Sequence, residues 1–143
     1  MNSFTKIMLI ICIVIVGCKK EDYFPNVSVN ESVFITGEQY HWPNGNIYDF
    51  ILISGGVGGI IIVQGHNETF IAYDRGCTYE NNNNNINNDC IIDTTSTTHI
   101  FSCTECCGSK FSIIDGSVSK GPATRGLKTY NTYFDGSHLH ITN

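Results

Sequence analysis

The sequence predicts an all-β fold, built as one small domain. After residue 24, no segment keeps the hydrophobic period of a helix. Short runs of Val, Ile, Phe, Tyr and Thr are instead separated by Gly, Asn, Asp and Pro, with turns about eight to twelve residues apart. The length of 143 residues suits a single domain. We therefore expect small antiparallel sheets packed as a sandwich or partial barrel.

The β-forming runs predict the order of the strands. We expect strands at 27–35, 48–53, 60–64, 69–73, 90–93, 97–102, 111–113, 127–134 and 139–142. Short turns make hairpins of three neighbouring pairs, namely 60–64 with 69–73, 90–93 with 97–102, and 127–134 with 139–142. The glycine-rich residues 55–59 lack the Lys-Ser/Thr ending and the helix that a phosphate-binding loop requires. We interpret them as a hinge or bulge between strands.

The first residues have the pattern of an export signal. Lys6 precedes an apolar run over 7–16, which is shorter than the roughly 20 residues of a membrane-spanning helix. The run ends in Ile15-Val16-Gly17-Cys18, which resembles the lipobox of bacterial lipoproteins. We expect a signal peptide at 1–17, a tether at 18–26 and one domain at 27–143. Cys18 would carry lipid and anchor the protein to a membrane of the bacterial cell envelope; an ordinary signal peptide is the alternative.

Net charge and cysteine content narrow the function further. The net charge of −5 argues against a nucleic-acid partner, which would require a basic surface. Seven cysteines in a short chain indicate disulfides, a metal site or lipidation. Cys12 leaves with the signal peptide and Cys18 takes the lipid, so five remain in a compartment where disulfides persist. These are Cys77, Cys90, Cys103, Cys106 and Cys107.

The five cysteines form two clusters, each between two expected strands. The first begins at Cys77 and continues to Cys90 after a run in which seven of the eight residues 81–88 are Asn, which predicts an exposed surface loop. The second spans residues 103–107. Two hairpin tips of this kind can meet over one metal centre, and thiolates suit zinc or iron–sulfur clusters. Backbone amides near Gly108 and Ser109 would hydrogen-bond to the sulfurs.

Several motifs in sequence order resemble the Rieske-type iron–sulfur domain. The family's first box, C-T-H-x-G-C, corresponds to Cys77-Thr78-Tyr79 and then Cys90 after an insertion. Its second box, C-P-C-H-G-S-x-F, corresponds to residues 103–111, with one residue inserted. The later Gly121-Pro122-Ala123, Leu127 and Tyr130 also match the family. The resemblance covers roughly residues 45–142 and implies small antiparallel sheets with two cysteine-bearing loop tips.

The resemblance also implies roles for the site residues. Cys77 and Cys103 fall on the two cluster cysteines, and Cys90 and Cys106 fall on the pair that forms a disulfide beside the cluster. The two cluster histidines are replaced by Tyr79 and Cys107. A neutral tyrosine hydroxyl is a poor iron ligand beside thiolates.

Three outcomes for the site follow. In the first, a 2Fe–2S cluster is bound by Cys77, Cys103, Cys107 and either Tyr79 or Cys90, and Cys106 is a further candidate ligand. In the second, four cysteines hold a structural zinc, for example Cys77, Cys90, Cys103 and Cys106. In the third, the cysteines form only disulfides and no metal is bound.

The resulting functional prediction is a membrane-anchored lipoprotein that transfers electrons to a redox partner protein if it retains the cluster. The alternative is a binding or structural lipoprotein that kept the fold and lost the cofactor. No arrangement of nucleophile and base points to an enzyme with its own catalytic site. Asp74 and Arg75, before the first box, are interpreted as a surface pair or a turn brace.

Overall fold

The computed structural model describes residues 24–35, 46–79, 90–95 and 99–143. These contain no helix and nine strands. The strands are β1 (Asn30–Phe34), β2 (Phe50–Ile53), β3 (Ile60–Gln64), β4 (Phe70–Asp74), β5 (Ile100–Ser102), β6 (Lys110–Ser112), β7 (Val118–Lys120), β8 (Thr129–Phe134) and β9 (His138–Thr142). The predicted all-β class is therefore confirmed. The expected signal peptide, Cys18 and the Asn-rich run lie outside the described residues.

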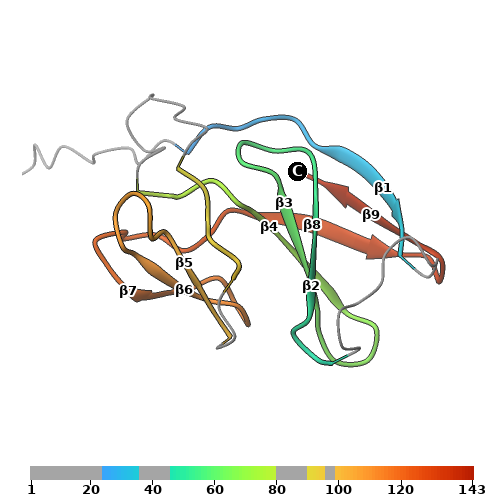
Figure 1. Ribbon diagram of the computed structural model, residues 1–143. Coiled ribbons are helices and arrows are strands. Elements are labelled where there is room, and N and C mark those ends of the chain that lie inside the picture. Colours follow the sequence, from blue (N-terminus) through green and yellow to red (C-terminus); the bar gives the residue numbers. More distant parts are fainter. Residues whose placement is uncertain (1–23, 36–45, 80–89, 96–98) are drawn as a thin grey trace, which may run out of the picture.

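The strands form two antiparallel sheets. The larger has six strands in the order β1-β9-β8-β4-β3-β2, and the smaller has three in the order β5-β6-β7. Figure 1 shows the smaller sheet beside one end of the larger one, with the segment after β4 running towards it. Within the described part of the chain there is no helix that is long and apolar enough to span a membrane.

Strand β3 explains why the fold has two cores. Residues 60–63 are all fully buried, because both faces of this strand are covered. Ile60 and Ile62 face what we call the aliphatic core, which comprises Val29, Val33, Ile35, Ile51, Ile60, Ile62, Ala72, Tyr130, Leu139 and Ile141. Ile61 and Val63 face the cysteine core, which comprises Ile61, Val63, Tyr73, Cys77, Cys90, Ile92, Phe101, Cys103, Phe111, Ile113, Ala123 and Leu127.

Two of the three expected hairpins are present. β3 pairs with β4, with Ile62 opposite Ala72, and β8 pairs with β9, with Thr132 opposite Ile141. The third, 90–93 with 97–102, is present only at Asp93, which makes an isolated antiparallel bridge to Ser102. Ile91 of the same segment makes another isolated bridge, to Gly76, so residues 90–93 connect the loop after β4 to β5.

Strand β7 was not predicted. Gly116 and Gly121 lie on either side of it, and no strand was expected between residues 113 and 127. The strand is only three residues long and pairs with β6 through a register shift near Lys110, so its own sequence gives little indication of it.

Candidate metal centre

Two loops bring the cysteines together at the ends of strands. Cys77 lies three residues beyond the end of β4, and Cys103 directly follows β5. The loop from Cys103 to β6 closes on itself: the Cys103 amide donates to the Ser109 carbonyl (2.8 Å), and the Gly108 amide donates to the Cys103 carbonyl (2.7 Å). Gly108 has a φ of 70°, a conformation that glycine adopts without steric cost. The second box is thus a tight, hydrogen-bonded loop.

The first loop is attached to the second by a covalent bond. The Cys77 amide donates to the Cys90 carbonyl over 2.9 Å, which places Cys90 beside the first loop although the sequence between them is long. Cys90 forms a disulfide with Cys106, 16 residues later. This is the pair that the family resemblance implied. The disulfide fastens the segment beside the first loop to the tip of the second.

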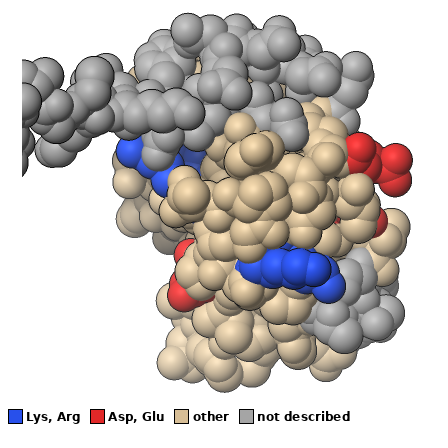
Figure 2. Space-filling model, turned by 90° about the vertical axis from the view of Figure 1, so that its left-hand side faces the viewer, with Lys and Arg blue, Asp and Glu red and all other residues tan. Residues whose placement is uncertain are grey.

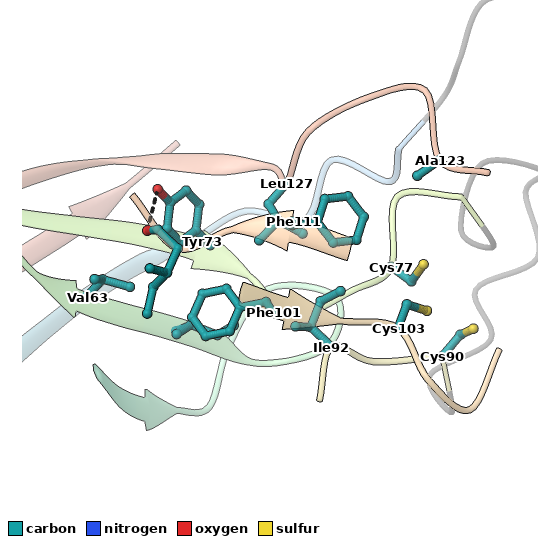
Figure 3. Packing of buried hydrophobic residues seen from close by; sticks show 12 residues of the cluster. Val63, Tyr73, Cys77, Cys90, Ile92, Phe101, Cys103, Phe111, Ala123 and Leu127 are labelled. Carbon is teal, nitrogen blue, oxygen red and sulfur yellow. Dashed lines mark hydrogen bonds between the residues drawn. The ribbon is translucent and has the colours of Figure 1, made fainter. Parts of the chain in front are cut away.

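The remaining three cysteines converge between the loops. The sulfurs of Cys77, Cys103 and Cys107 all lie within 4.8 Å of one another, and the Cys77 and Cys107 sulfurs are 3.5 Å apart. Cys77 and Cys103 are fully buried, whereas Cys107 is half-buried. Figure 3 shows Cys77, Cys103 and Cys90 at one end of the cysteine core, beyond the aromatic rings. Three thiols at this separation are a donor set suited to a thiophilic metal or an iron–sulfur cluster.

Ser109 connects this thiol group to the next loop. Its fully buried hydroxyl accepts a hydrogen bond from the Ala123 amide (2.8 Å) and one from the Cys107 thiol (3.0 Å). Because a hydroxyl is both donor and acceptor, the same oxygen can donate to a Cys107 thiolate once a metal has displaced the thiol proton. The sequence indicated this position through its Gly-Ser pair, although only the backbone amides were expected to contribute.

The protonation of the thiols depends on their burial. A hydrogen bond with the Cys77 thiol and, next, burial raise the pKa of the Cys103 thiol above its ordinary value. Without a metal, Cys103 is therefore neutral at pH 7. Metal binding must release protons from this group, which makes metal affinity depend on pH.

The structure sorts the predicted ligands into three groups. Cys77, Cys103 and Cys107 come together, whereas Cys90 and Cys106 are bonded to each other. The sulfurs of this bonded pair also lie within 4.8 Å of the Cys103 sulfur. The disulfide removes two thiolates from the zinc set of Cys77, Cys90, Cys103 and Cys106, and it removes Cys106 from the candidate metal ligands. Tyr79 lies on the first loop with 42% of its surface exposed.

Asp74 is the residue that sequence reasoning placed least well. It was expected in a surface pair or a turn brace, yet it is completely buried. Its carboxylate accepts hydrogen bonds from the amides of Val57, Gly58 and Gly76 and from the Tyr130 hydroxyl. Of the two expectations, the brace is right and the surface pair is wrong. Its position at the end of an apolar strand, two residues before Gly76, was the available indication.

The surface around the smaller sheet carries separate charges of both signs among uncharged residues. Figure 2 views the molecule from the side on which β5, β6 and β7 lie in Figure 1, and most of the coloured surface there is tan. Thr104, Gly108 and Pro122 are exposed on the loops around the thiols, and so are the charged residues Glu105 and Arg125.

Comparisons with known proteins identify the fold. No protein-family model matches the sequence, and no curated protein matches it. Among solved structures, the chain is similar to the cyanobacterial plasma membrane Rieske protein PetC3 from Synechocystis, with 26% identity over 66% of this chain and 86% of that one and a TM-score of 0.51. The ferredoxin of carbazole 1,9a-dioxygenase from Nocardioides aromaticivorans matches with 10% identity over 82% of this chain and 98% of that one, at a TM-score of 0.46.

The first of these matches agrees with the motif order in the sequence and with the two sheets and two cysteine loops of the structure. The chain therefore carries a domain of the Rieske type.

Proposed function

We propose that this protein is an electron-transfer lipoprotein of the bacterial cell envelope, and that its Rieske-type domain holds a 2Fe–2S cluster through Cys77, Cys103, Cys107 and Tyr79. The observation that carries the proposal is the convergence of three thiols within 4.8 Å, at the two loops where the family resemblance locates its cluster. Tyr79 is the fourth candidate because Cys90 is engaged in the disulfide.

A bound cluster would supply one-electron chemistry, and the chain's own residues would set its conditions. Cys77 and Cys103 lie in a buried, water-poor environment, and the Ser109 hydroxyl is hydrogen-bonded to Cys107. Cys107 is half-buried, so it is the side from which a partner protein would exchange electrons. Because histidine ligands raise the potential of Rieske centres, a site without them would have a lower potential.

Membrane attachment is proposed from the sequence. Lipid on Cys18 and the tether at 18–26 would keep the domain close to the membrane surface. The similar cyanobacterial protein is described as a plasma membrane protein, which is consistent with this location. Incorporation of labelled palmitate into the intact chain, and its loss in a Cys18→Ser variant, would be the expected result; equal labelling of both would contradict a lipid on Cys18.

A second candidate function is a binding or structural lipoprotein without a redox centre. The replacement of both cluster histidines, by Tyr79 and Cys107, favours it. In that case the disulfide and the two cores would hold the fold, and the three thiols would carry no iron.

Metal analysis of anaerobically purified, full-length protein separates the two candidates. We expect a coloured protein with about two iron and two sulfide per chain. Cys77→Ser, Cys103→Ser and Cys107→Ser should each remove most of the iron, whereas Glu105→Gln, on the same loop but exposed, should keep it. A colourless wild-type protein without iron would overturn the proposal. Zinc in place of iron, lost on treatment with a chelator, would indicate a structural zinc site instead.

A further inference from the structure

We propose that Asp74 and the glycine-rich segment 55–59 form a clamp that positions Cys77, and thereby tunes the thiol site; its effect on a bound metal rests on the function proposed above. The sequence indicated only a hinge or bulge at 55–59. In the structure, this segment contacts the chain directly before Cys77, and a buried carboxylate joins the two.

Each oxygen of the Asp74 carboxylate accepts two hydrogen bonds from neighbouring groups. Oδ2 accepts hydrogen bonds from the Val57 amide (2.7 Å) and the Tyr130 hydroxyl (2.6 Å), and Oδ1 accepts from the amides of Gly58 (3.1 Å) and Gly76 (2.6 Å). Two of these donors lie in the glycine segment, one directly precedes Cys77, and one comes from β8. Hydrogen bonds to a charged acceptor are stronger than neutral ones, particularly in a buried site.

The glycines allow the two backbones to touch. A Cβ atom on Gly58 would lie 2.7 Å from the Gly76 nitrogen and 2.9 Å from the Arg75 carbonyl carbon. A Cβ atom on Gly56 would lie 2.6 Å from the Tyr130 hydroxyl and would also clash with the Asp74 carboxylate. The space that a side chain would need at Gly56 and Gly58 is therefore occupied by other atoms of the clamp, so only glycine fits at these two positions.

The segment before Cys77 is fixed from its other side as well. The Arg75 amide donates to the Gly59 carbonyl (2.9 Å), and the Arg75 carbonyl accepts from the Ile92 amide (2.7 Å). The next pair joins Cys77 to Cys90. Residues 74–77 thus lie between the glycine segment and residues 90–92, so that a change on the glycine side is transmitted to the Cys77 backbone.

Tyr130 completes the clamp from β8. Its hydroxyl is a donor to Asp74, and burial, followed by the hydrogen bond and charge of Asp74, raises the pKa of this phenol well above its ordinary value. The hydroxyl therefore keeps its proton throughout the ordinary pH range. Removing the hydroxyl takes one of the four donors from Asp74 while the ring remains in place.

The test compares Tyr130→Phe with Tyr133→Phe, which removes a hydroxyl from an exposed position on the same strand. In metal-free protein with the disulfide intact, the rate of Cys77 alkylation is followed by peptide mass mapping. A buried thiol reacts through local opening, so we expect a rate increase of roughly tenfold in Tyr130→Phe and no change in Tyr133→Phe. Gly58→Ala, which presses on the Gly76 backbone, should have at least the same effect.

The same variants separate this clamp from general destabilisation. Ile62→Val, in the aliphatic core, serves as a variant of comparable stability that removes none of the hydrogen bonds to Asp74. In loaded protein, Tyr130→Phe and Gly58→Ala should shift the reduction potential, and Tyr133→Phe and Ile62→Val should not. Unchanged Cys77 reactivity in both clamp variants, or equal increases in Ile62→Val, would overturn the inference. The alkylation rate is measured in metal-free protein. An absence of iron in the wild type would therefore overturn the proposed function, whereas the alkylation rates would still decide whether the clamp positions Cys77.

Discussion

The aliphatic core and the cysteine core share strands β3 and β4 but are stabilised in different ways. The aliphatic core is lined by Val, Ile, Leu and Ala with a single Tyr, and nearly all of it comes from paired strands. The cysteine core contains three aromatic rings and three cysteines, and much of it lies on loops and on strands of three residues. One side therefore depends on strand register, and the other on individual links between loops.

The links on the cysteine side are few and specific. They are the disulfide between Cys90 and Cys106, the carboxylate of Asp74 and the hydroxyl of Ser109. Each joins segments that are distant in sequence. The larger sheet thus serves as the support, and the links hold the thiols at a fixed place on it. Changes to the two sides should consequently have different effects on the thiol site, even where their cost in stability is similar.

Truncation of the two cores gives the largest expected effects. Phe111→Ala should lower the free energy of unfolding by about 3–5 kcal/mol, and Ile62→Ala by about 2–5 kcal/mol, because both side chains are fully buried. Only Phe111→Ala, on the cysteine side, should also raise the reactivity of the thiols under native conditions. Denaturant unfolding and thiol labelling measure the two quantities. Leu52→Ala, at a residue that is 41% exposed, is the control; equal thiol reactivity in both core variants would contradict the division into two cores.

Removal of the disulfide should cause the next largest loss in the free energy of unfolding. A Cys90→Ser/Cys106→Ser double variant opens a cross-link between residues 16 apart, for which chain entropy predicts a loss of about 3 kcal/mol. The double variant avoids a new unpaired thiol. Denaturant unfolding of this variant should match that of the wild type after reduction, if reduction acts only on this bond. A loss far below 1 kcal/mol would mean that the hydrogen bond between Cys77 and Cys90 already fixes the loops.

Tyr73 should make the cysteine core sensitive to alkali. Its hydroxyl donates to the Ile113 carbonyl across the two sheets, and burial, followed by the charge of Asp115, raises its pKa to about 12. The folded protein holds this proton more tightly than the unfolded chain, whose tyrosine pKa is about 10. Stability is therefore fully present below pH 10 and should fall by about 2–3 kcal/mol as the pH rises to 12.

A Tyr73→Phe variant provides the comparison for this alkaline loss. It lacks the titrating group, so the slope of its unfolding free energy between pH 10 and pH 12 should be smaller than that of the wild type. Unfolding in denaturant at several pH values, with the disulfide state checked by mass, measures both slopes. Parallel slopes would show that other groups, and not Tyr73, account for the loss.

The two cores also differ in how far the sequence predicted them. The apolar run at 60–63 and the hairpins around it followed from residue pattern alone, because strand pairing of this kind depends on local composition and turns. The cysteine side was predicted through the two boxes. The bridge from Ile91 to Gly76 was not predicted, because Gly76 lies before the Asn-rich run and no local pattern marks it as a partner. The burial of Asp74 was missed for a similar reason, since a buried carboxylate is identified only by the donors that surround it.

Two turns share the sequence Asp-Gly-Ser, one on the side of the cysteine core and one on the side of the aliphatic core. They allow a closely matched comparison of the two sides, with the smallest expected effects on stability. Asp115 caps the turn before β7, and Asp135 caps the turn before β9. One oxygen of Asp115 accepts hydrogen bonds from the Ser117 amide and hydroxyl. One oxygen of Asp135 accepts the same two bonds from Ser137 and a third from the His138 amide. The other oxygen of Asp135 is hydrogen-bonded to the His140 ring. These bonds, in which the backbone amides of His138 and Ser137 contribute most, lower the pKa of Asp135, and the Ser117 bonds lower that of Asp115.

A lowered carboxyl pKa in the folded state gives stability that is present above the ordinary value of about 4 and is lost as the pH falls below it. Both Asp115→Asn and Asp135→Asn should therefore lose less stability than the wild type between pH 4 and pH 2. The flattening should be greater for Asp135→Asn, because its carboxylate has more donors, although both side chains are exposed and the effects are small. Thermal unfolding at several pH values measures them. The reverse order would mean that the carboxylate at β7, on the cysteine side, contributes more than its hydrogen bonds indicate.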